Sequence, residues 1–138
     1  MSIQENKALV LKALQLLGDR DLPALFDLIH EDGSWSVPFD PARFQFGGYR
    51  DKPGIIELLT GFLGGFDSFS FVVDNATAEE ERVVVEAHSE GVGPAGARYH
   101  NNYILIFFIK DGKLHTVREY FDPFKVYAYI EQFPQEGA

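Results

Sequence analysis

Glu119 stands in the part of this sequence that is best suited to proton-transfer chemistry. The segment RYHNNYILIFFIKDGKLHTVREYFDP, residues 98–123, surrounds it with apolar side chains at alternating positions. A carboxyl group on an apolar wall loses hydration when it is charged, so its pKa rises toward neutrality, where a general acid or base is most effective. The sequence therefore predicts Glu119 as a catalytic acid and base. The alternative interpretation is a structural carboxylate that pairs with an arginine or a helix N-terminus.

Polar residues near Glu119 are candidates for binding a substrate. His115 precedes it at even spacing, which gives both residues the same side of an extended strand, and an imidazole ionises close to neutral pH. Strand alternation also gives this side to Asn102, whereas Asn101 takes the opposite side unless a bulge exchanges the two. His115 has a plainer interpretation as a satisfied residue at the rim of the site.

The Asp111-Gly112 turn predicts that this segment folds as one long β-hairpin, because both turn residues tolerate positive φ. A two-residue turn would place Ile104 opposite Glu119. The face expected to line a pocket then holds Asn102, Ile104, Ile106, Phe108, His115, Val117, Glu119 and Phe121. The opposite face holds Asn101, Tyr103, Leu105, Phe107, Thr116, Arg118 and Tyr120.

Both faces of the predicted hairpin are largely apolar, so each must be covered. We expect helices over one face and either another sheet or a second copy of the chain over the other. The homodimer predicted in this way buries an apolar set on the outer face: Tyr103, Leu105, Phe107 and Tyr120.

The other elements follow from hydrophobic spacing and from turn residues. They are predicted in this order: helices over 3–18 and 21–30, a strand over 34–37, a helix over 51–65, strands over 69–74 and 82–91, and then the hairpin. Helices gathered at the start and strands at the end are typical of an α+β fold, with helices on one face of a curved antiparallel sheet.

The composition predicts one domain, residues 1–138, and argues against several kinds of partner. A net charge of −9 opposes binding to nucleic acid or to an anionic membrane. Cysteine is absent, which excludes a thiolate nucleophile and thiolate metal ligands. The first residues lack the features of a signal peptide and no apolar run is long enough to span a bilayer, so a cytoplasmic protein is expected.

Glu86, His88 and Glu90 alternate along one predicted strand and raise the question of a metal site. Side chains spread along a straight strand do not converge on one ion. We interpret them as a solvated face, and no metal is expected.

Three segments, by their order and spacing, resemble the nuclear-transport-factor-two-like superfamily in its SnoaL-like and ketosteroid-isomerase-like branch: LGDRDLPALFDLIHEDGSW at 17–35, GGYRDKPGIIELLTGFL at 47–63 and DGKLHTVREYFDP at 111–123. The resemblance covers nearly the whole chain. It implies a cone-shaped α+β barrel, in which a curved antiparallel sheet and three N-terminal helices enclose an apolar pocket. Trp35, Tyr49 and Phe121 are then expected among the aromatic residues that shape a ligand site.

The last third of the chain also resembles the phenazine-biosynthesis A/B proteins, through Asn101, Tyr103, Phe107, Gly112, the run Arg118-Glu119-Tyr120 and Pro123. In those proteins a glutamate in the matching place lies in the ligand cavity and acts as an acid/base group, which supports that role for Glu119. The aspartate that serves ketosteroid isomerase as general base, before a proline in the first strand, is replaced here by Val37. Steroid isomerisation by that mechanism is therefore not expected.

Together the residues and the resemblance predict a SnoaL-like enzyme that acts on a small, mostly apolar metabolite by general acid/base chemistry, without a cofactor. The reaction would be an isomerisation, cyclisation, dehydration or condensation. The alternative is a non-catalytic module of the same fold that binds a small molecule or mediates dimerisation.

Overall fold

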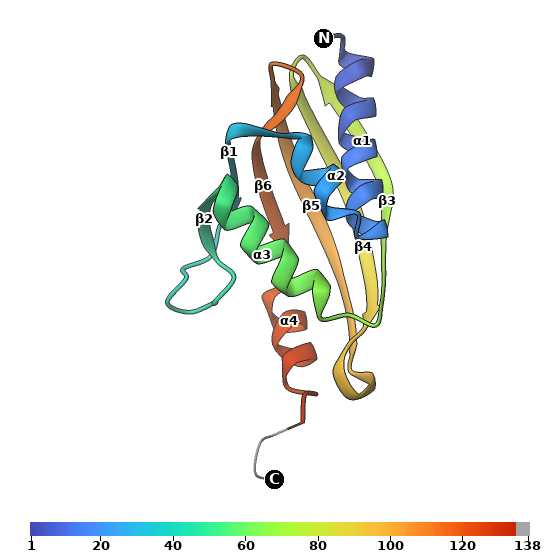
Figure 1. Ribbon diagram of the computed structural model, residues 1–138, viewed down its shortest axis with the longest axis vertical. Helices are drawn as coiled ribbons and strands as arrows, with labels where there is room; N and C mark the ends of the chain where they lie inside the picture. Colours follow the sequence, from blue (N-terminus) through green and yellow to red (C-terminus); the bar gives the residue numbers. More distant parts are fainter. Residues whose placement is uncertain (135–138) are drawn as a thin grey trace.

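The computed structural model describes residues 1–134, which form four α-helices and a six-stranded sheet (Figure 1). The helices are α1 (Ile3–Asp19), α2 (Leu22–Asp27), α3 (Lys52–Gly64) and α4 (Pro123–Ile130). The strands are β1 (Ile29–Val37), β2 (Gly48–Asp51), β3 (Ser68–Glu79), β4 (Arg82–Val92), β5 (Arg98–Lys110) and β6 (Lys113–Phe121), with a short 3₁₀ turn over Pro94–Gly96 between β4 and β5. The N-terminal helices cover one face of the sheet, and α4 lies at the end of the sheet to which β6 leads (Figure 1).

The strands follow the order β2-β1-β6-β5-β4-β3 across the sheet. Neighbours run antiparallel except β1 and β6, which are parallel because the chain crosses from one to the other through the rest of the fold. The predicted α+β class with helices over a curved sheet is confirmed. The sheet stays open, with β2 and β3 at its two edges.

Local capping signals fix the ends of the first and third helices. Ser2 and Glu5 form a reciprocal capping box at the start of α1, with hydrogen bonds of 3.0 and 3.1 Å. Arg20, in the left-handed conformation, caps the end of α1. The helix therefore ends slightly beyond Gly18, where the sequence predicted its end. The Asp51 side chain accepts a hydrogen bond from the Gly54 N–H and caps α3 as predicted.

Two elements were not predicted from the sequence. β2 forms within a segment that was expected to be a loop and pairs with β1. α4 begins at Pro123, where the Asp122 side chain accepts a hydrogen bond from the Phe124 N–H, and it buries Val126 and Tyr129. An acidic cap followed by proline is a helix-start signal, and Asp122 and Pro123 provide it here.

A β-bulge in β6 changes the register of the hairpin. The Asp111-Gly112 turn forms as predicted, with positive φ at both residues. The ladder then shifts, because Phe108 pairs with Thr116 and leaves His115 as an extra residue without a partner in β5. Every pair beyond this point is displaced by one residue.

The displacement inverts the predicted faces of β5. Leu105, in place of Ile104, lies opposite Glu119. Tyr103, Leu105 and Phe107 are therefore buried on the helix side, at 7%, 1% and 1% exposed, whereas Ile104 is 47% exposed on the outer face. The faces of β6 beyond the bulge are unaffected, because alternation within one strand does not depend on its partner.

The predicted dimer surface is wrong in three of its members for the same reason. Tyr103, Leu105 and Phe107 belong to the hydrophobic core and cannot contact a second copy. Tyr120 does lie outside, at 41% exposed. The outer apolar residue of β5 next to it in register is Ile104.

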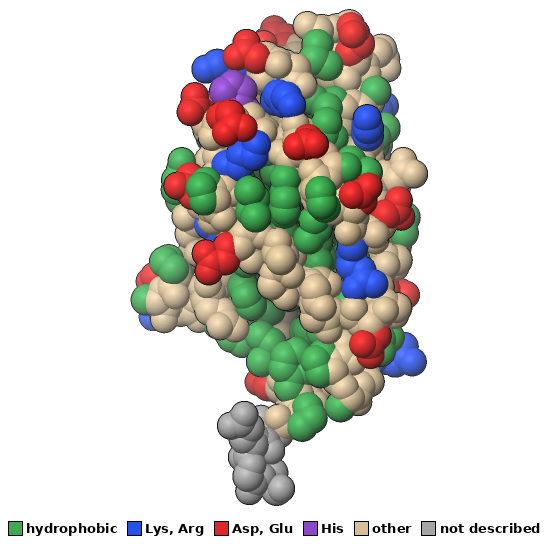
Figure 2. Space-filling model, in the orientation of Figure 1, with side chains coloured by type: hydrophobic (Ala, Val, Ile, Leu, Met, Phe, Trp, Pro, Cys, Tyr) green, Lys and Arg blue, Asp and Glu red, His purple; other side chains and the backbone are tan. Residues whose placement is uncertain are grey.

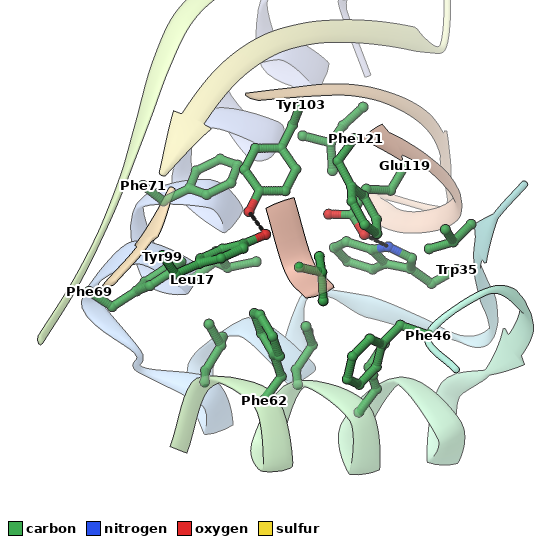
Figure 3. Close-up of a pocket in the computed structure, with 16 residues that line it drawn as sticks. Leu17, Trp35, Phe46, Phe62, Phe69, Phe71, Tyr99, Tyr103, Glu119 and Phe121 are labelled. Carbon is green, nitrogen blue, oxygen red and sulfur yellow. Dashed lines mark hydrogen bonds between the residues drawn. The ribbon is translucent and has the colours of Figure 1, made fainter. Parts of the chain in front are cut away.

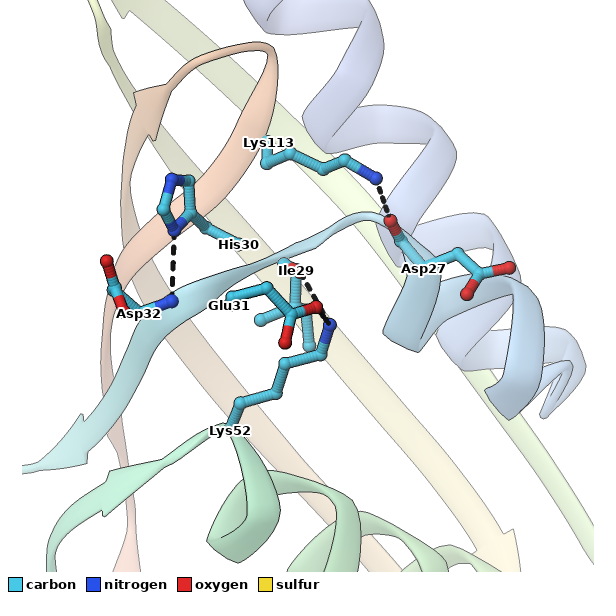
Figure 4. Close-up of polar contacts among 7 residues, drawn as sticks. All are labelled: Asp27, Ile29, His30, Glu31, Asp32, Lys52 and Lys113. Carbon is cyan, nitrogen blue, oxygen red and sulfur yellow. Dashed lines mark hydrogen bonds and ion pairs between the residues drawn. The ribbon is translucent and has the colours of Figure 1, made fainter.

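Polar contacts hold the start of β1 against α3 and the hairpin (Figure 4). The Lys52 ammonium donates to the carbonyl oxygen of Ile29 at 2.9 Å and to the Glu31 carboxylate at 3.0 Å. The hydrogen bond and charge of Lys52 lower the pKa of Glu31. Lys113, at the start of β6, donates to the carbonyl oxygen of Asp27. Among the helices of residues 1–134, none combines the length and the apolarity that crossing a membrane would require.

Candidate functional site

A pocket of about 70 Å³ lies between the helices and the inner face of the sheet (Figure 3). Its walls come from α1, α3, β1, the loop before β2, β3, β5, β6 and α4, and most of its lining side chains are aliphatic or aromatic. Glu119 is the single carboxylate among the lining residues that the structure describes. Its neighbours on β6, Val117 and Phe121, point to the same side of the sheet by strand alternation.

Trp35 holds the Glu119 carboxyl in place. Its indole Nε1–H donates to Glu119 Oε1 at 3.2 Å (Figure 3). Trp35 comes from β1, which lies parallel to β6, and its side chain is 3% exposed. Within residues 1–134 this is the carboxyl group's sole hydrogen bond, so the second oxygen remains available to a ligand.

The pocket changes the acidity of Glu119. Burial among apolar walls disfavours the charged form and raises the pKa of Glu119 to about 7, although the Trp35 hydrogen bond and the positive charge of Arg50 act in the opposite direction. A group with this pKa is present in both protonation states at neutral pH. It can therefore accept a proton and return one.

Two tyrosine hydroxyls face Glu119 across the pocket (Figure 3). The Tyr99 and Tyr103 hydroxyl oxygens lie 3.0 Å apart, and the Tyr103 hydroxyl lies 2.8 Å from the hydroxyl of Ser89. Burial raises the pKa of Tyr99 to about 12, with a smaller contribution from the charge of Glu119. Burial likewise raises the pKa of Tyr103. Both side chains therefore stay protonated at neutral pH and remain hydrogen-bond donors.

The Asn101 side chain limits which of the linked hydroxyl groups can act as hydrogen-bond donors toward the pocket. Its Oδ1 accepts from the backbone N–H of Asn102 at 2.9 Å and of Asp122 at 3.1 Å, which identifies Nδ2 as the donor end of the amide. Nδ2–H donates to the Tyr99 hydroxyl oxygen and to the Asp122 carbonyl oxygen, each at 2.9 Å. The Tyr99 oxygen thus accepts from Asn101, and when it also accepts from Tyr103 its own proton is free to bind an oxygen atom of a ligand.

Only some of the site residues predicted from the sequence line the pocket. Trp35 and Phe121 line the pocket together with Glu119. Asn101 is 0% exposed and stands behind Tyr99, so it acts on the pocket through that hydroxyl. The alternative of Asn102 on the pocket face is wrong, since Asn102 is exposed on the outer face.

Two further candidates lie outside the pocket lining. His115 is the bulge residue, with its Nδ1 3.0 Å from the Thr116 hydroxyl and its ring against that of His30. It faces a separate hollow near the hairpin turn. Tyr49, on the edge strand β2, is 70% exposed.

Tyr99 and Tyr103 were missed as site residues because the bulge was not foreseen. Ideal pairing from the turn placed Tyr103 on the outer face. A bulge that exchanges the faces of Asn101 and Asn102 also turns Tyr99 and Tyr103 inward.

Metal ligands do not gather in the described part of the chain. No group of three or more His, Asp or Glu side chains there could hold a metal ion. His88 instead pairs with Asp74, with His88 Nδ1 2.9 Å from Asp74 Oδ2, and Glu86 and Glu90 are exposed.

Comparison with known proteins gives one family match. Residues 10–117 match the family model described as SnoaL-like domain. UPF0523 protein C of Dictyostelium discoideum is 28% identical over 102 residues, which cover 72% of this chain and 65% of that protein. The matched part of the chain thus spans less than two thirds of the length of that relative.

Similarity over most of the length is found in two other comparisons. The uncharacterized PhzA/B-like protein PA3332 of Pseudomonas aeruginosa is 25% identical over 122 residues, or 86% of this chain and 85% of that protein. The crystal structure of TerC, co-crystallised with polyporic acid, superposes with a TM-score of 0.79 at 22% identity and covers 93% of this chain and 99% of that chain. At this identity the likeness to TerC shows the fold alone.

Proposed function

Because this chain belongs to the SnoaL-like domain family, we propose that it is a cytoplasmic enzyme that moves a proton within a small, mostly apolar, carbonyl-bearing metabolite. Glu119 is the general acid and base. Trp35 fixes its carboxyl group, and Phe121 shapes the pocket beside it. A small-molecule ligand agrees with the structural neighbour TerC, which was co-crystallised with polyporic acid.

One observation carries the proposal. Glu119 is a lone carboxyl on an otherwise apolar wall in the described part of the chain, and one of its oxygens is held by Trp35 while the other is left for a ligand. A structural carboxylate would instead pair with a cation or with several backbone N–H groups. No such partner lies within hydrogen-bond distance of it among residues 1–134.

The proposed step is proton abstraction next to a carbonyl group. The Glu119 carboxylate takes a proton from the carbon beside the carbonyl; the electron pair of the broken C–H bond forms a C=C double bond, and the π pair of the carbonyl moves onto its oxygen. The Tyr99 hydroxyl donates a hydrogen bond to that oxygen as its negative charge develops. Protonated Glu119 then returns the proton to another atom of the ligand, as an isomerase, cyclase, dehydratase or condensing enzyme requires.

These residues need no cofactor for the step, because the carbonyl group of the substrate itself accepts the electron pair. Asn101 acts as a positioning residue, through its hydrogen bond to Tyr99. His115, Asn102 and Tyr49 have no part in the proposed chemistry.

We also propose a homodimer formed through the outer face of the sheet. The supporting observation is the exposure of apolar side chains there, with Ile104 at 47% and Tyr120 at 41%. Tyr103, Leu105 and Phe107 support this face from the inside as core residues.

The chemistry can be tested without knowledge of the natural substrate. 1-Indanone is a compact cyclic ketone with exchangeable protons beside its carbonyl, and its deuterium uptake in D₂O is followed by NMR. The protein is expected to accelerate exchange, with a rate that rises with pH around an apparent pKa of about 7. Glu119→Gln should reduce exchange to the uncatalysed rate, and Tyr99→Phe should slow it by about 100-fold.

Glu86→Gln provides the matched control, since Glu86 is exposed on the outer face of β4 and does not line the pocket. It should leave exchange unchanged. Full activity in Glu119→Gln would refute the assignment. Binding of 1-indanone without any exchange would instead favour the alternative, a module that holds a small molecule without converting it.

A further inference from the structure

A groove of about 640 Å³ lies between α3, α4 and the loop before β2, outside the pocket. Phe46, Leu58 and Phe62 line both hollows. Figure 2 shows hydrophobic side chains gathered toward the end of the molecule where α4 lies. The groove is therefore an outward continuation of the pocket.

Side chains separate the groove from the pocket. The rings of Phe46 and Phe62 stand edge to face with centroids 5.7 Å apart, and both are half-buried. Rotation of partly exposed side chains is fast and needs no rearrangement of the fold. These two rings thus form an aperture through which the hollows can join.

The pocket is too small to hold a whole metabolite of ordinary size. A volume of about 70 Å³ holds roughly five water molecules, comparable to a single ring. A ligand that reaches Glu119 with anything more than one ring must extend through the aperture into the groove. The chemistry of the groove then decides which ligands fit.

Arg50 supplies the positive charge of this groove. It lies directly opposite Trp35 in the pairing of β2 with β1, which gives both side chains the same face of the sheet. One guanidinium N–H donates to the carbonyl oxygen of Phe46 at 3.0 Å. No Asp or Glu oxygen of the described residues lies within ion-pair distance of Arg50, so its other N–H groups are available.

We propose that the groove is the outer half of the ligand site and that Arg50 binds a carboxylate there. The ligand class is a small amphipathic carboxylic acid, with its ring in the pocket near Glu119 and its acid group in the groove. This inference rests on the proposed function for the identity of the pocket as the ligand site, but it concerns binding and needs no turnover.

The preference for a carboxylate follows from the geometry of the guanidinium. Its planar set of N–H donors matches the two oxygens of a carboxylate, and such charge-assisted hydrogen bonds are stronger than neutral ones. The apolar walls contributed by Phe46 and Ile130 limit screening by water. Glu57 also lines the groove, but it is exposed on α3, where solvent and salt weaken its repulsion.

The charge preference is tested with 3-phenylpropionate and its neutral counterpart 3-phenylpropionamide, by calorimetric titration at pH 7.5. The protein should bind the acid about tenfold more tightly than the amide. Arg50→Gln should abolish this preference. Arg118→Gln, which removes the same charge from the outer face of β6, should retain it.

The groove itself is tested by filling it. A Cβ at Gly61 or at Gly64 of α3 would meet no atom within 4 Å, so both positions accept a larger side chain, yet only Gly61 lines the groove. Gly61→Phe should weaken binding of both probes at least about tenfold. Gly64→Phe is the matched control and should bind them as the unaltered chain does.

Equal affinity for acid and amide, an acid preference that persists in Arg50→Gln, or unchanged binding in Gly61→Phe would each overturn the inference, as would a failure of both probes to bind. These outcomes are separable from the test of chemistry. Loss of 1-indanone exchange in Glu119→Gln with no acid preference would leave the proton-transfer function standing without the groove. An acid preference in a protein that exchanges nothing would leave the binding site without the chemistry.

Discussion

Glu119 ties the stability of the fold to pH. In the unfolded chain its carboxyl group has the ordinary pKa of 4.5, and burial raises this pKa to about 7 in the folded protein. Between these values the folded state binds more protons than the unfolded state, so the free energy of unfolding must fall as the pH rises. The contribution is fully present below pH 4.5 and is lost as the pH passes through about 7.

Glu119→Gln should remove this pH dependence. The neutral amide carries no charge to desolvate, so the variant is expected to gain about 3 kcal/mol relative to the unaltered protein between pH 4.5 and 7.5. Urea unfolding at the two pH values measures the difference. Glu86→Gln, at an exposed position, should show no such gain. A Glu119→Gln variant that tracks the unaltered protein at both pH values would mean that the carboxylate is well solvated.

The sequence predicted the position of the Glu119 side chain better than it predicted which residues contact it. Alternation within one strand placed Val117, Glu119 and Phe121 together, and this holds whatever the strand pairs with. The cross-strand partners depend on register, so a single extra residue sufficed to exchange Asn102 for Asn101. The Trp35 contact joins residues far apart in the chain, and no local pattern encodes it.

The β-bulge at His115 is the element that decides which side chains reach the pocket. It lets Leu114 and Val117, at 1% and 2% exposed, face the core from the same strand. If His115 instead occupied a regular ladder position after Leu114, alternation would turn Val117 outward and bring Arg118 into the core. The bulge therefore keeps Val117 and Glu119 on the pocket side of a strand that contains His115.

Deletion of His115 should cost about 1 kcal/mol or less, because Leu114 followed directly by Thr116 alternates regularly and leaves Val117 inside and Arg118 outside. His115→Ala keeps the extra residue and should also cost about 1 kcal/mol. Urea unfolding monitored by circular dichroism compares the two variants. A loss of several kcal/mol on deletion alone would show that the fold requires the bulged backbone and not only the register that it permits.

The elements predicted well are those with local signals. The Asp51 cap and the Asp111-Gly112 turn are determined by residues that lie next to each other in the sequence, and both form as expected. The parallel pairing of β1 with β6 has no local signature, because the two strands meet only once the rest of the chain has folded. The bulge has no local sequence signal either, since His115 continues the alternation of polar and apolar residues that precedes it.

The whole molecule presents two unlike sides. Helices cover the inner face of the sheet, whereas the outer face exposes apolar side chains, including Val72 at 45% and Ile104 at 47%. Phe108 lies on that face between two arginines, with Arg82 and Arg118 at 5.6 and 5.5 Å from its ring centroid. A second copy of the chain would bury this apolar centre and leave the arginines toward its rim, as in a typical interface.

Light scattering coupled to size-exclusion chromatography should therefore give about twice the 15.5 kDa chain mass at micromolar concentration. Ile104→Lys places a charge at the centre of the proposed interface, where the twofold relation brings two copies of it together, and should yield a monomer. Ile56→Lys makes the same substitution at a residue that is 36% exposed on α3, on the opposite side of the molecule, and should leave the dimer intact. A monomeric unaltered protein, or a dimer that survives Ile104→Lys, would exclude this face as the interface.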